Sequence, residues 1–126
     1  MGNIKGIGVD VVDVKRMKGV LEKQKEYFLN KVFSDMEVTY CKTRSKPYIH
    51  FAARFAAKEA VAKAMRTGWS GAFHWRDIEV VNDQSGAPHI LLSRNVAEAL
   101  VQCNVHLSLS HSDNTVVAFV VLESKK

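Results

Sequence analysis

The stretch from Phe51 to Met65 contains the side chains with the clearest potential for chemistry. Its sequence, FAARFAAKEAVAKAM, predicts an uninterrupted helix because alanine is the strongest helix former. Within this stretch Lys58 and Glu59 are adjacent, and Lys63 follows Glu59 by one helical turn. A helix this apolar should be buried, and buried charges are costly unless they are paired. The charges are therefore either mutual partners or the lining of a site.

Helical spacing arranges the charged side chains of this region in two neighbouring stripes. One stripe holds Glu59, Lys63 and Arg66, and the other holds Arg54 and Lys58. Glu before Lys at this spacing favours a simple ion pair between Glu59 and Lys63, which is the structural interpretation. Three basic groups near one carboxylate exceed the needs of one ion pair. They would suit a polyphosphate held by a divalent metal.

A second candidate, Asp10, lies inside a predicted strand. Residues 5–14 alternate and are rich in Val and Ile, which predicts a strand, where Asp is disfavoured. Alternation places Asp10 on the face of Gly8 and Val12, as a solvent-facing acid or as a metal ligand. Gly6 and Gly8 lack the third glycine of a dinucleotide fingerprint. They predict instead that another backbone or a ligand comes close to the strand.

A third candidate cluster lies in the run HLSLSHSDN, which contains Ser108, Ser110, His111 and Ser112. Serines at a strand end commonly satisfy the backbone of a turn, and a single histidine there is more often structural. At a strand-to-turn junction, however, His111 could reach a phosphate.

The remaining sequence predicts the elements that position these groups. Asp13 can cap a following helix, Ser34 and Glu37 form a capping box, and Pro47 suits the first turn of the long helix. Helices are expected at 14–24, 25–33, 34–42, 47–66 and 94–102, and strands at 5–14, 75–82, 89–92, 105–110 and 115–123. The prediction is a single α+β domain over residues 1–126, with a mostly antiparallel sheet packed on a long central helix.

Composition narrows the function classes. The formal net charge of +5 favours an anionic partner, but no nucleic-acid-binding string is present, so we expect no nucleic-acid binding. No apolar run approaches the roughly 20 residues of a membrane helix. The first residues are too polar for a signal peptide, and the distant Cys41 and Cys103 are expected to be reduced thiols. These features predict a cytoplasmic protein that does not bind membranes.

Four segments, in order, resemble the holo-acyl-carrier-protein synthase family of phosphopantetheinyl transferases: GIGVDVVDVKRM, FSDMEVTYC, RFAAKEAVAKAM and VHLSLSHSDNTVVAFVVLE. The resemblance covers nearly the whole chain, and the Lys-Glu-Ala helix is its most specific part. It implies Mg²⁺-dependent transfer of 4′-phosphopantetheine from coenzyme A to a serine of an acidic apo-acyl carrier protein. The other product would be adenosine 3′,5′-bisphosphate. It also implies a homotrimer with active sites at subunit interfaces, and a place in fatty acid biosynthesis.

The same resemblance implies roles for individual residues. Asp10 and Glu59 would be the magnesium ligands, with Glu59 also the candidate base for the serine hydroxyl, and Lys63 would stabilise charge on the leaving phosphate. Arg16 and Met17, on the basic first helix, would dock the carrier protein. The residues implied to contact coenzyme A are Arg54, Lys58, Lys63, Thr67, Gly68, Ser110 and His111. The chain departs from the family at Arg66, where glycine is common.

Two other functions fit parts of the same pattern. A non-catalytic basic module, with Glu59 and Lys63 as a structural pair, would bind many polyanions with strong salt dependence and form no covalent product. A transferase for multidomain synthases is the other possibility, but those enzymes resemble two such domains fused, and this chain contains one.

Overall fold

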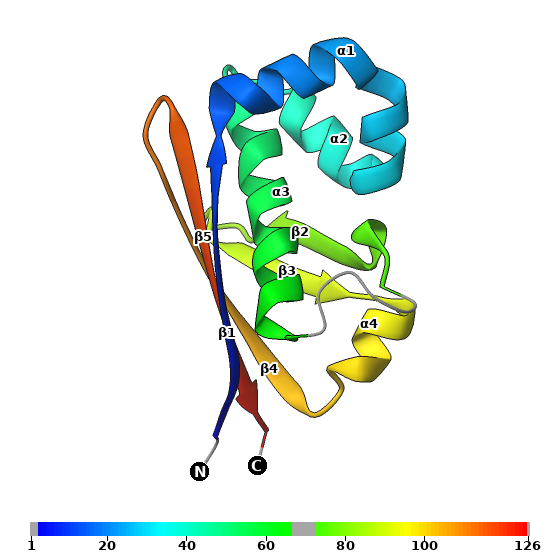
Figure 1. Cartoon of the computed structure of the whole chain (residues 1–126), viewed down its shortest axis with the longest axis vertical. Helices are drawn as coiled ribbons and strands as arrows, with labels where there is room; N and C mark the ends of the chain where they lie inside the picture. Colours follow the sequence, from blue (N-terminus) through cyan, green and yellow to red (C-terminus); the bar gives the residue numbers. More distant parts are fainter. Residues whose placement is uncertain (1–2, 67–72, 126) are drawn as a thin grey trace.

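The long apolar helix α3 (Pro47–Ala64) lies at the centre of the fold, where it contacts strands on one side and helices on the other (Figure 1). The computed structural model describes residues 3–66 and 73–125. The other described elements are β1 (Ile4–Asp13), α1 (Val14–Val32), α2 (Asp35–Lys42), the 3₁₀ helix η1 (Trp75–Asp77), β2 (Ile78–Asn82), β3 (Pro88–Leu92), α4 (Arg94–Ala99), β4 (Cys103–His111) and β5 (Thr115–Ser124). The predicted α+β class, with antiparallel sheets and a central helix, is confirmed.

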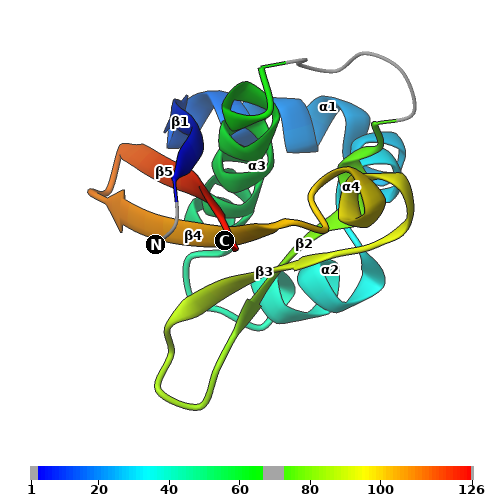
Figure 2. The same ribbon diagram turned by 90° about the horizontal axis from the view of Figure 1, so that it is seen from below.

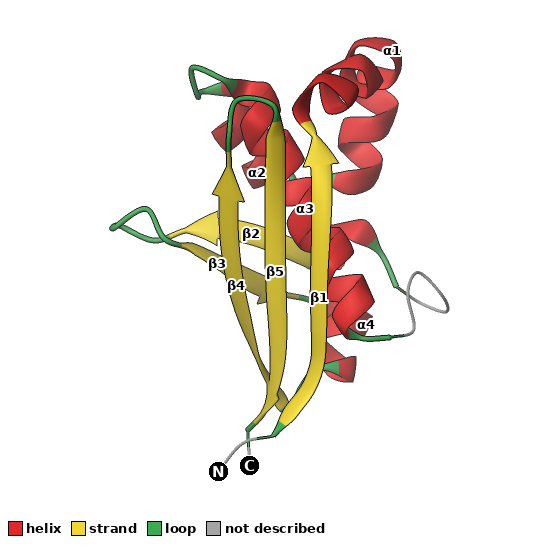
Figure 3. Ribbon diagram, turned by 60° about the vertical axis from the view of Figure 1, so that its left-hand side comes forward, coloured by secondary structure: helices red, strands yellow, loops and turns green. Residues whose placement is uncertain are grey.

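Three long antiparallel strands form the main sheet, in the order β1-β5-β4. The register pairs Asp10 with Ala118, and Ala118 with Leu109 on the other side of β5. Figure 3 shows the helices gathered on one side of these strands. The strands β2 and β3 form a separate antiparallel hairpin, and Figure 2 shows α3 nearly end-on between the main sheet, α1 and this hairpin. The two edges of the main sheet are therefore β1 and β4.

The packing of β1 against α3 depends on the two glycines of the strand. A Cβ atom added to Gly8 would lie 1.9 Å from the carbonyl oxygen of Ala60, and one added to Gly6 would lie 1.9 Å from that of Ala64. Both distances are far below van der Waals contact, so only glycine lets the strand and the helix backbone approach this closely. The predicted close approach is therefore confirmed, and the neighbour is the backbone of α3.

We expect Gly8→Ala to lower the free energy of unfolding by about 1–3 kcal/mol or more, because the new methyl group must displace the helix backbone. Urea denaturation monitored by circular dichroism measures the change. The matched control is Gly19→Ala within α1, where a Cβ meets nothing within 4 Å. That control should raise stability by about 0.5–1 kcal/mol, since alanine favours a helix. Equal stability of Gly8→Ala and wild type would contradict the close packing.

The predicted signals at the starts of α1, α2 and α3 are confirmed. The side chain of Asp13 accepts hydrogen bonds from the backbone N–H groups of Lys15 and Arg16. The capping box of Ser34 and Glu37 is present in both directions, and Pro47 occupies the first turn of α3. The two predicted helices before residue 33 are joined in α1, which is interrupted where Gln24 leaves the helical conformation (φ −128°, ψ 31°).

Several predicted boundaries are wrong. Residues 75–77 form a 3₁₀ turn rather than the start of a strand, because the backbone N–H of Ile78 donates to the carbonyl oxygen of Trp75, three residues earlier. The helix α4 ends at Ala99, since β4 already begins at Cys103. The helix α3 ends at Ala64, because Arg66 has a left-handed backbone (φ 65°) that cannot continue it.

The two cysteines are not joined in a disulfide, as predicted. Cys41 and Cys103 are free thiols, and burial raises the pKa of Cys41 to about 12. Cys41 is therefore an inert core residue at neutral pH. Among residues 3–66 and 73–125, no helix has the length and apolar character needed to cross a membrane.

Candidate active site

Asp10 and Glu59 line the same cavity, called here the carboxylate cavity, which has a volume of about 300 Å³. Strand alternation points Asp10 toward α3, on the face of Gly8, and α3 presents Glu59 to the same space. Arg16 and Met17 line it from α1. The fold thus brings two carboxylates together from elements that are far apart in the sequence.

Lys63 of α3 contacts the carboxylate cavity through Asp10, one of its lining residues. Its ammonium group lies 2.9 Å from a carboxylate oxygen of Asp10 and donates to the backbone carbonyl of Val9 at 3.2 Å. The Lys63 side chain is half exposed, whereas Asp10 is mostly buried. A cation with one side in solvent and one side on Asp10 is well placed to meet a phosphate that enters the cavity.

Lys58 does not suit the coenzyme A role that the family resemblance implies, and this assignment is corrected. Its side chain is 0% exposed, and its ammonium nitrogen lies 2.8 Å from a carboxylate oxygen of Glu37, which is also 0% exposed. The same group donates to the backbone carbonyls of Trp75 and Ile78. Burial lowers the pKa of Lys58, and the charge of Glu37 acts in the opposite direction. An ammonium with these partners holds the core together and is inaccessible to a ligand.

Glu37 extends this buried ionic cluster, a role that the sequence did not reveal. Its carboxylate accepts from the backbone N–H of Ser34 at 3.0 Å and from that of Val80 at 2.9 Å. It therefore joins α2 to β2 as well as to α3. The capping box was the visible signal, but it predicts only the local partners of Glu37 and not its distant partners Lys58 and Val80.

The carrier-protein docking role that the family resemblance implies for Met17 is also corrected. Its side chain is only 4% exposed and belongs to the hydrophobic core, so its helical spacing reflects packing. The neighbouring Arg16 is exposed and lines the carboxylate cavity.

Arg54 and His111 line a different cavity, called here the basic cavity, which has a volume of about 360 Å³ and lies beside β4. Arg54 is 2% exposed, donates to the side-chain oxygen of Asn82 at 2.7 Å, and lies 4.3 Å from the ring centre of Tyr40. Its buried Nε has no hydrogen-bond partner among the described residues. A buried guanidinium with an unused donor, in a cavity lined by a second basic side chain, favours an anion.

His50 is a lining residue of the basic cavity that the sequence analysis missed. Burial, followed by the charges of Arg54, Arg44 and His111, lowers the pKa of His50. Its position one helical turn before Arg54 was the available signal, because residues four apart share a helix face. Ser110, in contrast, is not among the lining residues, although Ser108 and His111 of the same strand are. Thr67 and Gly68 lie outside the described residues.

The predicted residues therefore form two groups on opposite edges of the main sheet. Asp10 belongs to the edge strand β1, and His111 to the edge strand β4, with β5 between them. No residue lines both cavities among those described. Within one chain the structure does not bring the carboxylates and the two basic side chains of the other cavity into a single site. No cluster of three or more His, Cys, Asp or Glu side chains fit for a metal occurs in the described part of the chain.

Comparison with known proteins supplies the family. The family model of the 4′-phosphopantetheinyl transferase superfamily matches residues 6–120. Holo-[acyl-carrier-protein] synthase of Protochlamydia amoebophila is 39% identical over 119 residues, which cover 94% of this chain and 98% of that protein. The crystal structure of holo-[acyl-carrier-protein] synthase from Neisseria meningitidis has a TM-score of 0.88 and 36% identity, covering 97% of this chain and 100% of that chain.

A further solved structure carries a ligand. Holo-(acyl-carrier-protein) synthase from Bacillus anthracis, determined in complex with CoA (3′,5′-ADP), has a TM-score of 0.81 and 38% identity, covering 96% of this chain and 97% of that chain. Family model, sequence relatives and solved structures agree over nearly the full length. The chain therefore belongs to the holo-acyl-carrier-protein synthase family of the 4′-phosphopantetheinyl transferase superfamily.

Proposed function

We propose that this enzyme transfers 4′-phosphopantetheine from coenzyme A to a serine of apo-acyl carrier protein, in a single domain spanning residues 1–126. The observation that carries the proposal is the carboxylate cavity, where Asp10 and Glu59 meet and Lys63 bonds Asp10. Relatives named for this reaction, one of them solved with coenzyme A, support the choice of substrates. In the cytoplasm, the reaction would serve fatty acid biosynthesis.

The donor set of the carboxylate cavity fits Mg²⁺. Two hard carboxylates, Asp10 and Glu59, leave room for waters and phosphate oxygens, and Mg²⁺ is usually bound in this way rather than in an all-protein cage. When bound, the ion would neutralise phosphate charge and polarise the phosphorus.

The residues in and beside the carboxylate cavity have different roles in the proposed reaction. Glu59 accepts the proton of the serine hydroxyl, directly or through an oriented water, as the serine oxygen bonds to the β-phosphorus of coenzyme A. The bond from that phosphorus to the bridging oxygen breaks, and adenosine 3′,5′-bisphosphate leaves. Lys63 stabilises the charge that develops on the leaving phosphate. Arg16, exposed on the rim, pairs with acidic groups of the carrier protein and speeds encounter.

The positions of the two cavities favour a site shared between subunits. In a cyclic homotrimer, the β4 edge of one subunit would face the β1 edge of the next, so that Arg54 and His111 complete the coenzyme A site beside Asp10 and Glu59. Ile7, Val9, Val11 and Phe119 are exposed apolar side chains of β1 and β5, as expected for strands covered by another subunit. Thr67, Gly68 and Ser110 remain proposed coenzyme A contacts from the family resemblance.

The decisive test is the intact mass of a purified apo-acyl carrier protein after incubation with this enzyme and coenzyme A. We expect a mass gain of one phosphopantetheine with Mg²⁺ and none with a chelator. A gain without metal would overturn the role of Mg²⁺. No gain with several carrier proteins, from a folded enzyme sample, would overturn the proposed reaction and favour the basic binding module instead.

A further inference from the structure

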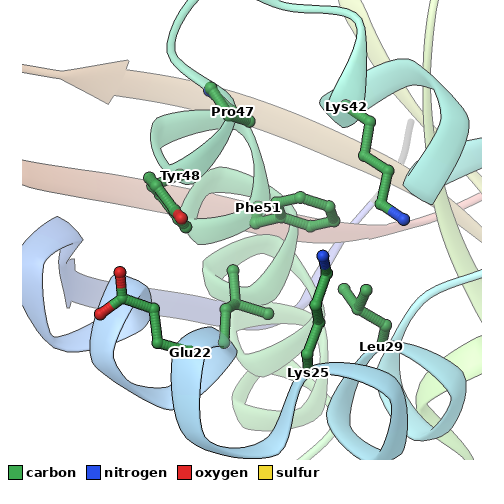
Figure 4. A pocket seen from close by; sticks show the side chains of 8 residues that line it. Glu22, Lys25, Leu29, Lys42, Pro47, Tyr48 and Phe51 are labelled. Atoms are coloured by element: carbon green, nitrogen blue, oxygen red, sulfur yellow. The ribbon is translucent and has the colours of Figure 1, made fainter.

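A third cavity, of about 490 Å³, lies between α1, α2 and the first turn of α3 (Figure 4). It shares no lining residue with the carboxylate cavity or the basic cavity among the described residues. The interruption of α1 at Gln24 lies beside it, since Leu21 lines it from before the break and Leu29 from after. The proposed transfer reaction gives this cavity no role.

The floor of this α1–α2–α3 cavity is apolar. Leu21, Leu29 and Phe51 line it, and each also belongs to the hydrophobic core. A volume of this size is within the range of small-molecule pockets, which bury most of their ligand against apolar side chains. The floor therefore suits an aliphatic group and not a purely polar ion.

Two ammonium groups lie at the mouth of the cavity. Figure 4 shows Lys25 of α1 and Lys42 of α2 directed into the hollow in front of the Phe51 ring. Within the described part of the chain, neither ammonium group has a hydrogen-bond acceptor or a carboxylate partner. Two like charges that converge on one hollow repel each other, and an anion bound between them would relieve that repulsion.

The rest of the rim leaves the net charge positive. Glu22 is the one carboxylate among the lining residues, and Figure 4 shows it below Tyr48, away from Lys25 and Lys42. Lys18 lies over the ring of Tyr48, 5.5 Å from its centre, and adds a further positive charge on that side. The cavity therefore offers an apolar floor, a tyrosine and a positive mouth.

We propose that the α1–α2–α3 cavity binds an aliphatic monocarboxylate, with the tail on Leu21, Leu29 and Phe51 and the carboxylate between Lys25 and Lys42. A single anionic head on an apolar tail satisfies both halves of the lining at once. Inorganic phosphate would leave the apolar floor uncovered, and a neutral hydrocarbon would leave the two ammonium groups unpaired. Such a ligand would join α1 to α2 from outside the carboxylate cavity.

Isothermal titration calorimetry of the full chain with octanoate, below the concentration at which it forms micelles, tests this proposal. We expect saturable one-to-one binding. Octanamide, which keeps the tail and removes the charge, and butyrate, which keeps the charge and shortens the tail, should each bind at least tenfold more weakly. Lys25→Gln combined with Lys42→Gln should weaken octanoate binding at least tenfold.

The matched control is Lys23→Gln combined with Lys31→Gln, which removes the same net charge at exposed positions of α1 that do not line the cavity. This control should bind octanoate as wild type does. Adenosine 3′,5′-bisphosphate should not compete with octanoate, so the result is independent of the proposed transfer reaction. Absence of binding, equal binding to both double variants, or competition by the bisphosphate would each overturn the proposal. If the wild-type protein does not bind octanoate and the Lys25 and Lys42 double variant loses carrier-protein docking, the proposal is also overturned, in favour of a protein-docking surface.

Discussion

Replacing Lys58 with methionine is expected to lower the free energy of unfolding by about 3–5 kcal/mol, the usual result of removing one partner of a buried ion pair. The substitution leaves the carboxylate of Glu37 charged in a place with no access to water. It also removes the donor for the backbone carbonyls of Trp75 and Ile78, which fix η1 at the start of β2. Three elements around α3 would lose their common anchor.

Urea denaturation, monitored by circular dichroism, measures this loss. The matched control is Lys46→Met, whose ion pair with Asp113 is exposed, with side chains 66% and 84% accessible. That pair should contribute no more than about 1 kcal/mol. Adding Glu37→Gln to Lys58→Met should restore part of the stability, since no unpaired charge then remains. A loss below about 1 kcal/mol for Lys58→Met alone would show that Lys58 does not anchor the core.

The second large effect is expected on the proposed reaction. Glu59→Gln should reduce the rate of carrier-protein modification by about 10²–10⁴-fold, the range expected when a general base is lost. Glutamine keeps the shape of the side chain, but it cannot accept the serine proton and is a poorer ligand for Mg²⁺. Since Glu59 is only partly buried, the free energy of unfolding should stay close to that of wild type.

The measurement is the initial rate of phosphopantetheine addition, followed by intact mass at fixed coenzyme A and Mg²⁺. Glu98→Gln, an exposed carboxylate on α4, is the matched control and should keep the wild-type rate. Glu59→Gln with nearly normal turnover would exclude Glu59 as the base. A folded Glu59→Gln variant that still binds coenzyme A would locate the defect in the chemical step.

Local signals predicted the helices and their first turns well. Asp13, Ser34 and Pro47 each act through neighbours within a few residues, so the sequence alone contains the whole interaction. The closeness of β1 to α3 was also predictable, because two glycines at alternate positions of a strand serve little other purpose.

The errors arose where a partner is distant in the sequence. Lys58 looks like a site residue from the helix alone, and its pairing with Glu37 depends on how α2 packs against α3. Met17 has the spacing of a surface stripe as well as of a core stripe, and only the neighbouring elements decide between them. The division of Asp10 and His111 between two edges follows from strand order, which residue types do not specify.

The pairing of β1 with β5 has a consequence for folding of the protein. The two strands are widely separated in the sequence, as shown by the partners Ile4 and Glu123. Contacts of such wide sequence separation form late in folding, because the long loop between them must close first. Since β5 is the neighbour of β1 in the main sheet, the strand that carries Asp10 is fixed only once this long-range pairing has formed.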